Sequence, residues 1–396
     1  MTDDTRRLDE LRALARELAA PLRGLALGLD RDPGLCTELL GLLPWRQLMG
    51  LPAAYNQDPI MLRGRPAYLD SCAEQVTAFE ELARVDAAAV LALPGPSMSG
   101  FAVSQLADEA QSERYFGLLA AEPTWTFFGM TEPARGSDPA GMSTALRPAA
   151  SGDAMVLSGV KRFVGNGARA ALGVVFARRS PGPLGISAVL LETDRPGFTA
   201  VPLDTLGLRG LQLSELRMDA VPIADADLLG RHRSATRQGM WAATRTFNRF
   251  RPVVACFALG VAQAAYDYVL EYRCPGHGRS GHLCPAGADG HVFEELAGRL
   301  RATRALVLAA ARSADRDPAD GTLASAAKIQ AVALAEQCTA TAVRMLGPGA
   351  RFDHPSLDKW VRDARAFEYM EGTGNIQRLT LAQGYLQGRL TDVRAA

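Results

Sequence analysis

Residues 128–138 read Phe-Gly-Met-Thr-Glu-Pro-Ala-Arg-Gly-Ser-Asp, and they lie where the chain changes from a helical pattern to a β pattern. Before this point, from Asp4 to about Thr126, apolar residues recur at spacings of three and four, which is typical of amphipathic helices. The first such series consists of Leu8, Leu11, Ala15, Leu18 and Leu22. Residues 77–90 and 106–119 show the same period, so we predict helices there.

After residues 128–138 the helical period is lost and later returns. Short β-type runs at residues 154–157, 162–164 and 172–176 are separated by turn clusters rich in glycine, proline, serine and aspartate. From about Ala235 the helical period resumes, and it predicts four long helices over residues 253–271, 291–312, 323–346 and 376–390. Four such helices are enough for an antiparallel bundle.

This pattern predicts an α+β fold that is mainly α and has three domains. They are an N-terminal α-helical domain over residues 1–126, a middle β-sheet or barrel domain over 127–236, and a C-terminal four-helix bundle over 237–396. A chain of 396 residues, 48% hydrophobic and 22% charged, is long enough for two or three such domains.

Bulk charge and cysteine usage restrict the possible partners and compartment. The formal net charge is zero, so no overall field favours nucleic acid or an anionic membrane. The N-terminus has no signal-peptide pattern, and no uninterrupted apolar run approaches the about 18 residues needed to cross a bilayer. Six scattered cysteines fit a reducing compartment, with thiols mostly buried. We therefore predict a cytoplasmic protein without membrane insertion.

Lysine is scarce in this sequence. Only Lys161, Lys328 and Lys359 are lysines, so 40 of the 43 basic residues are arginine. We interpret this skew as a result of genome base composition as much as of physics.

A second informative segment is Met370–Arg378, which reads Met-Glu-Gly-Thr-Gly-Asn-Ile-Gln-Arg. It places one carboxylate, that of Glu371, at a turn just before a predicted helix. Such a carboxylate can remove a proton if apolar surroundings raise its pKa above the free value of about 4.3. The alternative is a carboxylate that caps the N-terminus of the last helix. The segment alone leaves both hypotheses open.

The two segments together resemble motifs of the acyl-CoA dehydrogenase family, whose flavin loop reads T-E-P-x-x-G-S-D and whose catalytic loop reads E-G-T. Further segments that match in the expected order are residues 165–167, 207–209, 221–222, 228–230, 251–255 and 362–365. The resemblance covers roughly residues 75 to 390. It implies the same three-domain layout and the FAD-dependent dehydrogenation of an acyl thioester.

The resemblance also implies a mechanism. Glu371 would remove the α-proton, and its own backbone N–H would bind the thioester oxygen together with a ribityl hydroxyl of FAD. Flavin N5 would take the β-hydride. Polarising the thioester oxygen acidifies the α-carbon, because the developing enolate charge falls on that oxygen.

Further roles are implied for residues that match the family's motifs. Met130 and Thr131 would line the flavin edge, Phe163 and Val164 would lie against the ring, and Ser137, next to Gly136, would reach the pyrophosphate. The FAD contacts implied elsewhere are Arg279 (with Arg273 as its competitor) at the pyrophosphate, Gly347 at a neighbouring subunit, and Thr373 and Asn375 at the adenosine end. Substrate contacts are implied for Phe250, Arg251, Met370 and Gly372.

Several positions depart from the family pattern. Gly165 stands where family members carry a threonine near flavin N5, so we hypothesise altered hydride or oxygen reactivity. Phe250 replaces a smaller residue and suggests a reshaped pocket, while Arg344 and Pro348 weaken the assignment of Gly347. The variant Phe163-Val164-Gly165-Asn166-Gly167 resembles the motif in family branches from specialised metabolism. In these branches the acyl group is often bound to a carrier protein instead of coenzyme A.

One segment departs from the surrounding helical texture. Residues 274–291 hold three of the five histidines and two of the six cysteines, and Cys274, His277, His282 and Cys284 are suitable zinc ligands. Their spacing matches no common zinc finger, and the glycines and prolines favour a loop. We therefore predict no metal site.

Other functions on the same fold are a flavin-dependent oxidase or monooxygenase and a non-catalytic acyl-carrier binding protein. Monooxygenases of this kind dispense with the base carboxylate, so the presence of Glu371 argues against them. The partners implied by the resemblance are an electron-transfer flavoprotein or a similar acceptor and identical subunits in a dimer or tetramer. No nucleic-acid partner is expected.

Overall fold

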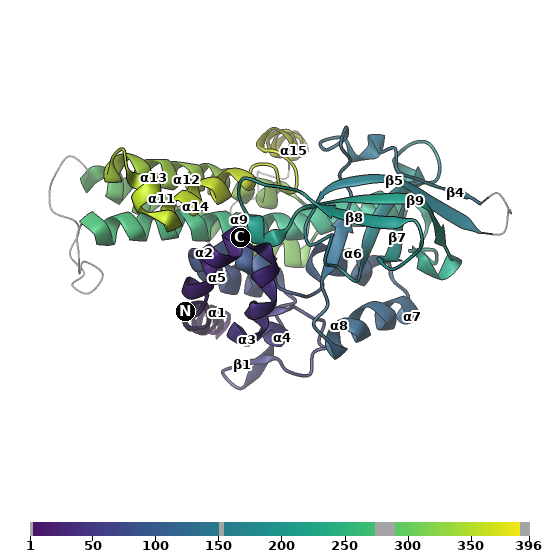
Figure 1. Cartoon of the computed structure of the whole chain (residues 1–396), viewed down its shortest axis with the longest axis horizontal. Helices are drawn as coiled ribbons and strands as arrows, with labels where there is room; N and C mark the ends of the chain where they lie inside the picture. Colours follow the sequence, from purple (N-terminus) through teal and green to yellow (C-terminus); the bar gives the residue numbers. More distant parts are fainter. Residues whose placement is uncertain (1–2, 150–153, 274–289, 389–396) are drawn as a thin grey trace.

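A computed structural model describes residues 3–149, 154–273 and 290–388. Along the chain, helical segments precede and follow a β-sheet domain. In space this sheet lies at one end of the molecule (Figure 1). This is the predicted α+β fold that is mainly α. Arg279 and the four residues considered as zinc ligands, Cys274, His277, His282 and Cys284, lie outside the described residues.

The N-terminal part packs short helices against one long helix. Its helices are α1 Asp3–Ala19, α2 Leu22–Arg31, η1 Pro33–Glu38, α3 Leu39–Leu42, α4 Trp45–Leu48, α5 Cys72–Leu91, α6 Ser97–Leu106, α7 Glu109–Ser112, η2 Glu113–Gly117 and α8 Leu118–Ala121. Leu8, Leu11 and Ala15 form the buried stripe of α1, as their spacing predicts. A small hairpin of β1 (Ile60–Leu62) and β2 (Arg65–Ala67) was not expected in this helical region.

The prediction of one helix over residues 106–119 was wrong at its start. α6 ends at Leu106, and a new helix begins after Asp108. The Asp108 side chain accepts from the Gln111 N–H at 2.9 Å, while the Gln111 side chain accepts from the Asp108 N–H at 3.1 Å. This capping box stabilises a second helix start, and a π-helical turn follows it.

The middle part is one eight-stranded sheet. Its strands are β3 Thr126–Gly129, β4 Ala145–Pro148, β5 Met155–Val164, β6 Leu172–Arg178, β7 Ile186–Glu192, β8 Phe198–Pro202, β9 Ser214–Ile223 and β10 Leu228–Leu229. The order is β10-β7-β6-β4-β5-β9-β8, and β3 pairs with β6 in parallel. Short 3-10 turns connect the strands, namely η3 Pro139–Gly141, η4 Pro183–Gly185, η5 Arg209–Leu211, η6 Asp225–Asp227 and η7 Ala235–Arg237.

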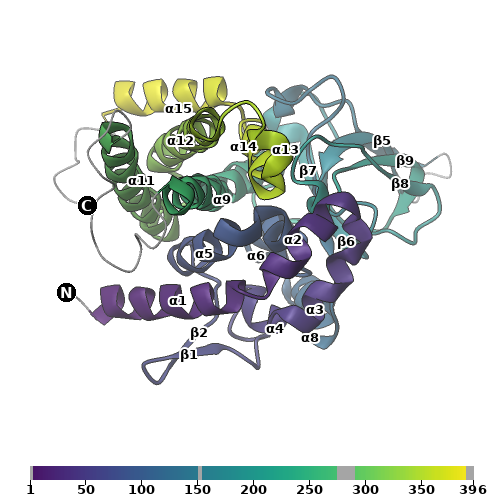
Figure 2. The same cartoon turned by 60° about the vertical axis from the view of Figure 1, so that its left-hand side comes forward.

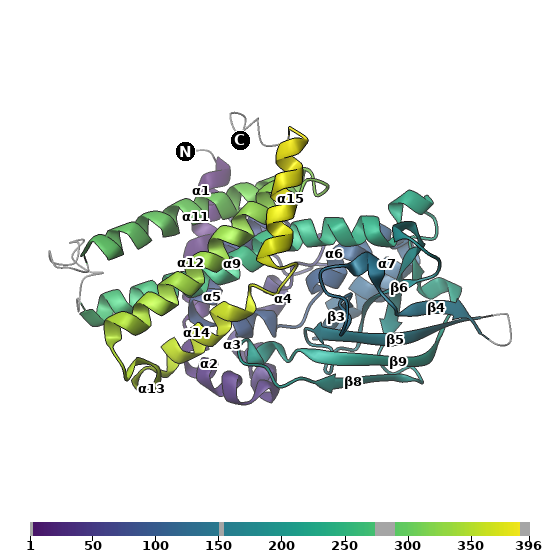
Figure 3. The same ribbon diagram turned by 90° about the horizontal axis from the view of Figure 1, so that it is seen from above.

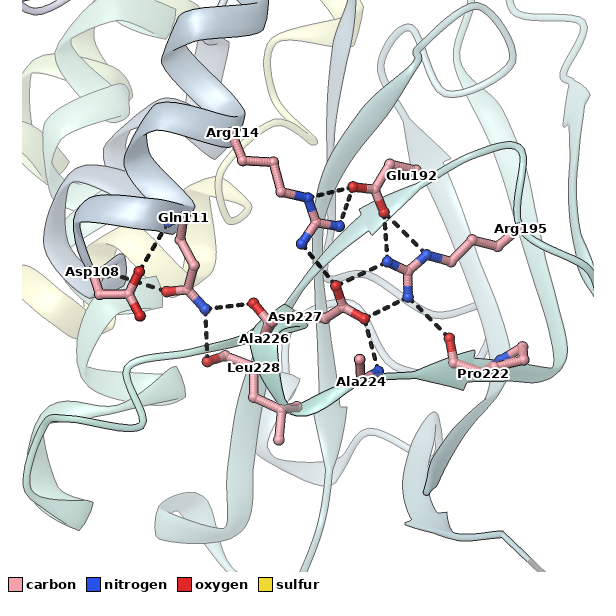
Figure 4. Close-up of polar contacts among 10 residues, drawn as sticks. All are labelled: Asp108, Gln111, Arg114, Glu192, Arg195, Pro222, Ala224, Ala226, Asp227 and Leu228. Atoms are coloured by element: carbon pink, nitrogen blue, oxygen red, sulfur yellow. Dashed lines mark hydrogen bonds and ion pairs between the residues drawn. The ribbon is translucent and has the colours of Figure 1, made fainter. Parts of the chain in front are cut away.

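A partly buried ion-pair network links the sheet to the helices around α7 (Figure 4). Asp227 in η6 accepts from Arg114 at 2.8 Å and from Arg195 at 2.5 Å, and Glu192 at the end of β7 pairs with both arginines. Desolvation alone would raise the pKa of Asp227, but hydrogen bonds from Arg195 and Arg114 outweigh it and lower that pKa. Gln111 adds bonds to the Ala226 and Leu228 carbonyls.

The C-terminal part contains the predicted long helices. They are α9 Gly239–Arg273, α11 Gly290–Arg316, α12 Thr322–Leu346 and α15 Gly374–Leu386, with the shorter α13 Ala350–Asp353 and α14 Pro355–Ala366 between the last two. α9, α11 and α12 pack along one another, and α15 lies across the outer side of α12 (Figures 2 and 3). The main core forms where α5, α9 and α12 meet.

α9 is much longer than predicted. It begins at Gly239 instead of near residue 253 and continues through Pro252. Proline removes one helical hydrogen bond and normally marks a helix boundary. Here Pro252 is buried, as are Val253 and Val254 after it. Tertiary packing of this part of α9 keeps the helix continuous. This continuity brings residues 241–249 into the same rigid element as Arg251.

Two matched segments turn out to hold the domains together. The Asp363 carboxylate accepts from the Leu208 N–H at 2.6 Å and from Lys359 at 2.6 Å, and Lys359 also meets Asp86 at 2.7 Å. A side chain at Gly207 would begin 2.3 Å from the Arg362 carbonyl oxygen. Glycine is therefore required there, because the two backbones approach closely.

The segment Ala235–Arg273 is long and apolar enough to cross a bilayer by length and mean hydropathy. The search for an uninterrupted apolar run in the sequence did not identify it. Of its most apolar window, 72% is buried inside the protein, as in the core helix of a globular fold. Four cysteines in the described ranges, Cys36, Cys72, Cys256 and Cys338, are buried free thiols. This agrees with the expectation that the thiols are mostly buried.

Candidate active site

Glu371 lies on the short connection between α14 and α15. Its backbone is in the left-handed region with φ of 53°, and Gly372 follows with φ of 94°. A positive φ at a non-glycine residue is strained and needs support from its surroundings. Such strain is common where a side chain must be held in one functional direction.

The capping hypothesis for Glu371 was wrong, because a neighbouring carboxylate has that role. Glu368 Oε1 accepts from the Gly374 N–H at 2.7 Å, at the start of α15. The Glu371 carboxylate accepts no hydrogen bond from any described residue. It is half-buried and available for chemistry.

The carbonyl groups of this connection are held by three side chains. Arg251 Nε donates to the Glu371 carbonyl at 3.1 Å, and Gln377 Nε2 donates to the carbonyls of Glu371 at 2.9 Å and Gly372 at 3.1 Å. Lys328 Nζ donates to the Glu368 carbonyl at 3.0 Å and also to that of Gly372. We name Arg251, Lys328 and Gln377 the carbonyl clamp.

Gln377 is itself fixed in orientation. Its Oε1 accepts from Ser325 Oγ on α12 at 2.8 Å, so both ends of the amide are used. The carbonyl clamp fixes the loop through its carbonyls, while the Glu371 N–H donates to no acceptor in the described residues. That N–H is therefore free to bind an oxygen of a ligand.

The electrostatics of the site favour proton transfer near neutral pH. Desolvation raises the pKa of Glu371 to about 7, although Lys328 and Arg251 act in the opposite direction. Desolvation also lowers the pKa of Lys328 to about 8 and that of Arg251 to about 10. A carboxylate with this pKa is matched to general-base catalysis at physiological pH.

An exposed aromatic wall lies where the β3 loop meets β5. The Arg162 N–H donates to the Thr131 carbonyl at 2.8 Å, which places Thr131 beside Phe163. Phe163 is 57% exposed and has φ of 60°, and the Arg162 guanidinium lies 5.5 Å from its ring centre. Met130 and Val164 are buried next to it. An exposed aromatic ring of this kind can stack on a flat apolar group, and the Thr131 hydroxyl can form hydrogen bonds beside it.

The glutamate of the first motif supports its loop through contacts inside the fold. Glu132 is buried and accepts from Ser143, from the Thr144 N–H at 2.7 Å and from Lys161 Nζ at 3.0 Å. Desolvation would raise its pKa, but these hydrogen bonds and the lysine lower it to about 2. Glu132 thereby anchors the loop that carries Gly136 and Ser137, both of which are exposed.

The sequence analysis did not identify the support of the first loop by Glu132 and Lys161. Of the carbonyl clamp it named only Arg251, as a substrate contact. The available signal was the scarcity of lysine. Lys161, Lys328 and Lys359 are each at most 1% exposed. Each one donates to two oxygen atoms, at least one of which belongs to a segment more than 25 residues away in sequence. A compact ammonium with three donors fits such enclosed positions, whereas the larger planar guanidinium does not.

The predicted substrate contacts fall into two groups. Arg251, Met370 and Gly372 belong to the Glu371 loop or contact it, and Met370 packs against the main core. Phe250 is buried and lines a cavity of about 420 Å³ between α5, α6 and α9. The Phe250 ring lies 6.3 Å from that of Phe101 on α6.

The remaining predicted FAD contacts lie apart from this loop or at its edge. Thr373 precedes α15 without a side-chain cap, and exposed Asn375 accepts from Arg378 at 3.3 Å. Gly347 ends α12 with φ of 91° and has no atom within 4 Å of an added Cβ. Arg273 ends α9, so the choice between Arg273 and Arg279 stays open.

Known proteins share this architecture and these motifs. The family model for the acyl-CoA dehydrogenase middle domain matches residues 127–221, and that for the acyl-CoA dehydrogenase C-terminal domain matches residues 237–386. Acyl-CoA dehydrogenase of Bacillus subtilis is 30% identical over 384 residues, covering 96% of this chain and 96% of that protein. Probable acyl-CoA dehydrogenase FadE25 of Mycobacterium tuberculosis is 30% identical over 313 residues, 78% of this chain and 79% of that protein.

Among solved structures, butyryl-CoA dehydrogenase from Megasphaera elsdenii is similar with a TM-score of 0.82 at 27% identity, covering 98% of this chain and 99% of that chain. Fold, motifs and relatives together define a flavoprotein oxidoreductase that acts on CH–CH groups. The chain belongs to the acyl-CoA dehydrogenase family.

Proposed function

We propose that this protein is a FAD-dependent dehydrogenase of acyl thioesters and that Glu371 removes the α-proton. The observation that carries this proposal is the Glu371 carboxylate. It is half-buried, has no hydrogen-bond donor in the described residues, has a pKa raised to about 7, and sits on a loop whose carbonyls are clamped.

The backbone N–H of Glu371, its carboxylate and the carbonyl clamp have separate roles in this reaction. The free N–H of Glu371 binds the thioester oxygen, which stabilises the negative charge that develops there. The carboxylate then takes the α-proton, and the carbonyl clamp holds both groups in register. Phe163 and Thr131 would hold the flavin, which when bound would supply the acceptor for the hydride from the β-carbon. The product is an α,β-unsaturated thioester.

Anaerobic spectroscopy tests this function. The purified protein should be yellow, and an acyl thioester should bleach its flavin absorbance without oxygen. A panel of coenzyme A and carrier-protein thioesters identifies the carrier, because both share the phosphopantetheine arm. A yellow protein whose flavin no thioester reduces would instead support a non-catalytic acyl-carrier binding protein.

FAD binding is tested at the aromatic wall. We expect Phe163→Ala to weaken FAD binding about tenfold or more, because the flavin loses the aromatic ring that stacks on it. Leu184→Ala is the matched control, since Leu184 is 64% exposed on the separate turn η4. Equal FAD affinity in both variants would place the cofactor elsewhere.

A flavin-dependent oxidase is the second candidate, and Gly165 is the observation that favours it. A Cβ at Gly165 would lie 2.8 Å from Leu211 Cδ1, so Leu211 occupies the space of the family's threonine side chain. The flavin edge therefore lacks a hydroxyl there. Oxygen uptake without an artificial acceptor would identify the oxidase. Gly165→Thr combined with Leu211→Ala, compared with Leu211→Ala alone, tests whether that hydroxyl suppresses the uptake.

The proposed partners follow from the family. An electron-transfer flavoprotein or a similar acceptor would reoxidise the flavin, and the compartment would be the cytoplasm. Identical subunits would associate as a dimer or tetramer, which agrees with exposed apolar residues on α15 and the connection before it. These are Tyr369, Leu379, Tyr385 and Leu386.

A further inference from the structure

The cavity that Phe250 lines has both apolar and polar walls. Phe250, Val253 and Phe257 of α9 supply apolar walls, but Gln75, Ser97, Ser104 and Gln105 also line it. Phe250 is adjacent to Arg251, which holds the Glu371 carbonyl. The cavity therefore borders the turn of α9 whose next residue contacts the Glu371 loop.

Three residues of α9 at a spacing of four present one face to this cavity. Trp241, Arg245 and Arg249 all line it. The Arg245 guanidinium lies 4.8 Å from the Trp241 ring centre, and that of Arg249 lies 4.8 Å from the Phe101 ring centre. Stacking of this kind leaves the edge of a guanidinium free to donate hydrogen bonds.

The two arginines differ in how their charge is compensated. Arg249 donates to the Asp70 carbonyl at 2.5 Å and lies 3.5 Å from the Asp315 carboxylate. Arg245 has neither an ion pair nor a side-chain hydrogen bond to any residue in the described ranges. It is nevertheless partly buried.

The charge balance of the cavity wall is positive. Its cationic residues are Arg233, Arg245 and Arg249, and its single carboxylate is Asp70, on the same side as Arg249. A partly buried guanidinium without a counter-ion is costly unless a ligand provides one. A carboxylate matches a guanidinium best, because it accepts two parallel hydrogen bonds.

We propose that the cavity binds acyl groups that end in a carboxylate and that Arg245 is the residue that recognises this group. The inference rests on the proposed function and specifies its substrate class. Such substrates are dicarboxylic acyl thioesters, in which one carboxyl forms the thioester and the other remains free.

Matched thioesters test this proposal. Anaerobic flavin reduction is measured with two coenzyme A thioesters of equal chain length, one ending in a carboxylate and one in a methyl group. We expect the native protein to favour the carboxylate form in kcat/KM by about tenfold to a hundredfold, as charged hydrogen bonds allow. Arg245→Leu should abolish this preference, because KM should rise for the carboxylate form and much less for the methyl form.

Arg237→Leu is the matched control, because Arg237 is exposed on η7 just before α9. It should leave the preference unchanged, and Arg245→Lys should restore part of it. Equal loss on both thioesters in Arg245→Leu would overturn the proposal, since Arg245 would then bind the shared coenzyme A arm. No preference in the native protein would overturn it as well.

Calorimetric binding of the same two thioesters to the FAD-loaded protein separates this inference from the proposed function. If neither thioester reduces the flavin, the proposed function fails, while a binding preference that depends on Arg245 still supports the carboxylate site. If the flavin is reduced but binding shows no preference, the proposed function stands and the carboxylate site fails.

Discussion

At the residue scale, the site depends on one carboxylate whose pKa is set by opposing effects. Desolvation raises the pKa of Glu371 to about 7, and the buried ammonium of Lys328 keeps it from rising further. Lys328 also holds two carbonyls of the same loop. One lysine thus controls both the proton affinity of the base and its position.

Replacement of Lys328 by methionine should therefore move the pH profile of flavin reduction. Removing a positive charge raises the pKa of Glu371, so the acidic limb of kcat/KM should shift to higher pH by about one unit. The maximal rate should also fall, because two carbonyls lose their donor. Stopped-flow flavin reduction between pH 5 and 9 measures both effects.

The matched variant is Lys328→Arg, which keeps the charge and alters the shape. Its acidic limb should stay near that of the native protein even if its rate is lower. An unmoved limb in Lys328→Met would show that Lys328 does not tune Glu371.

The same raised pKa has a cost in stability. A carboxyl with a folded-state pKa of about 7 and an unfolded value of about 4.3 binds more protons when folded, so stability falls as pH rises between these values. Glu371→Gln should therefore stabilise the protein at pH 8 by about 1–3 kcal/mol. This gain should disappear below about pH 4, where both states are protonated.

Denaturant unfolding of native and Glu371→Gln protein at pH 8 and pH 4 measures this difference. Glu122→Gln, at an exposed turn, is the control and should change stability little at either pH. Equal stability of the native and Glu371→Gln proteins at pH 8 would mean that Glu371 is not desolvated.

At the element scale, periodicity predicted where most helices lie but not how they end. α1 and α5 follow their apolar spacing, and the segment Phe128–Asp138 does mark the entry into the sheet. Pro252 misled the prediction for α9, since burial overrides its local preference. The helix start at α15 was also ambiguous, because Glu368 and Glu371 are both close enough to cap it and only the fold selects Glu368.

Gln377, in the first turn of α15, provides the element-scale test of the clamp. Its amide N–H groups donate to the carbonyls of the two residues with positive φ, Glu371 and Gly372. Gln377→Ala should lower the rate of flavin reduction about tenfold or more with FAD content unchanged, because the base is less well positioned.

Gln383→Ala is the matched control, since Gln383 is exposed on the same helix. If the two variants have equal rates, the clamp does not position Glu371.

At the scale of the whole molecule, the predicted class and layout agree with the structure, whereas the supporting contacts depend on residues far apart in sequence. Lys161 meets Glu132 across 29 residues, and Lys359 meets Asp86 across 273. No local pattern encodes such pairs. The scarcity of lysine was the one sequence signal for them, since each remaining lysine is buried at a junction.

The outer face of α15 gives a prediction for assembly. Leu379 and Leu386 are 60% and 83% exposed, which is unusual for large apolar side chains on one helix. If identical subunits meet there, Leu379→Glu with Leu386→Glu should reduce the particle mass in light scattering while circular dichroism stays unchanged. An unchanged mass in this variant would place the subunit contact on another face.

The most direct test of the central claim follows the α-proton itself. FAD-loaded protein is mixed in D₂O with an acyl thioester that carries no transferable β-hydrogen, and NMR records the exchange of its α-hydrogens. The native protein should exchange them at least about a hundredfold faster than Glu371→Gln, since only a carboxylate at this position can remove the proton. Equal exchange rates in the two proteins would contradict the assignment of Glu371 as the base.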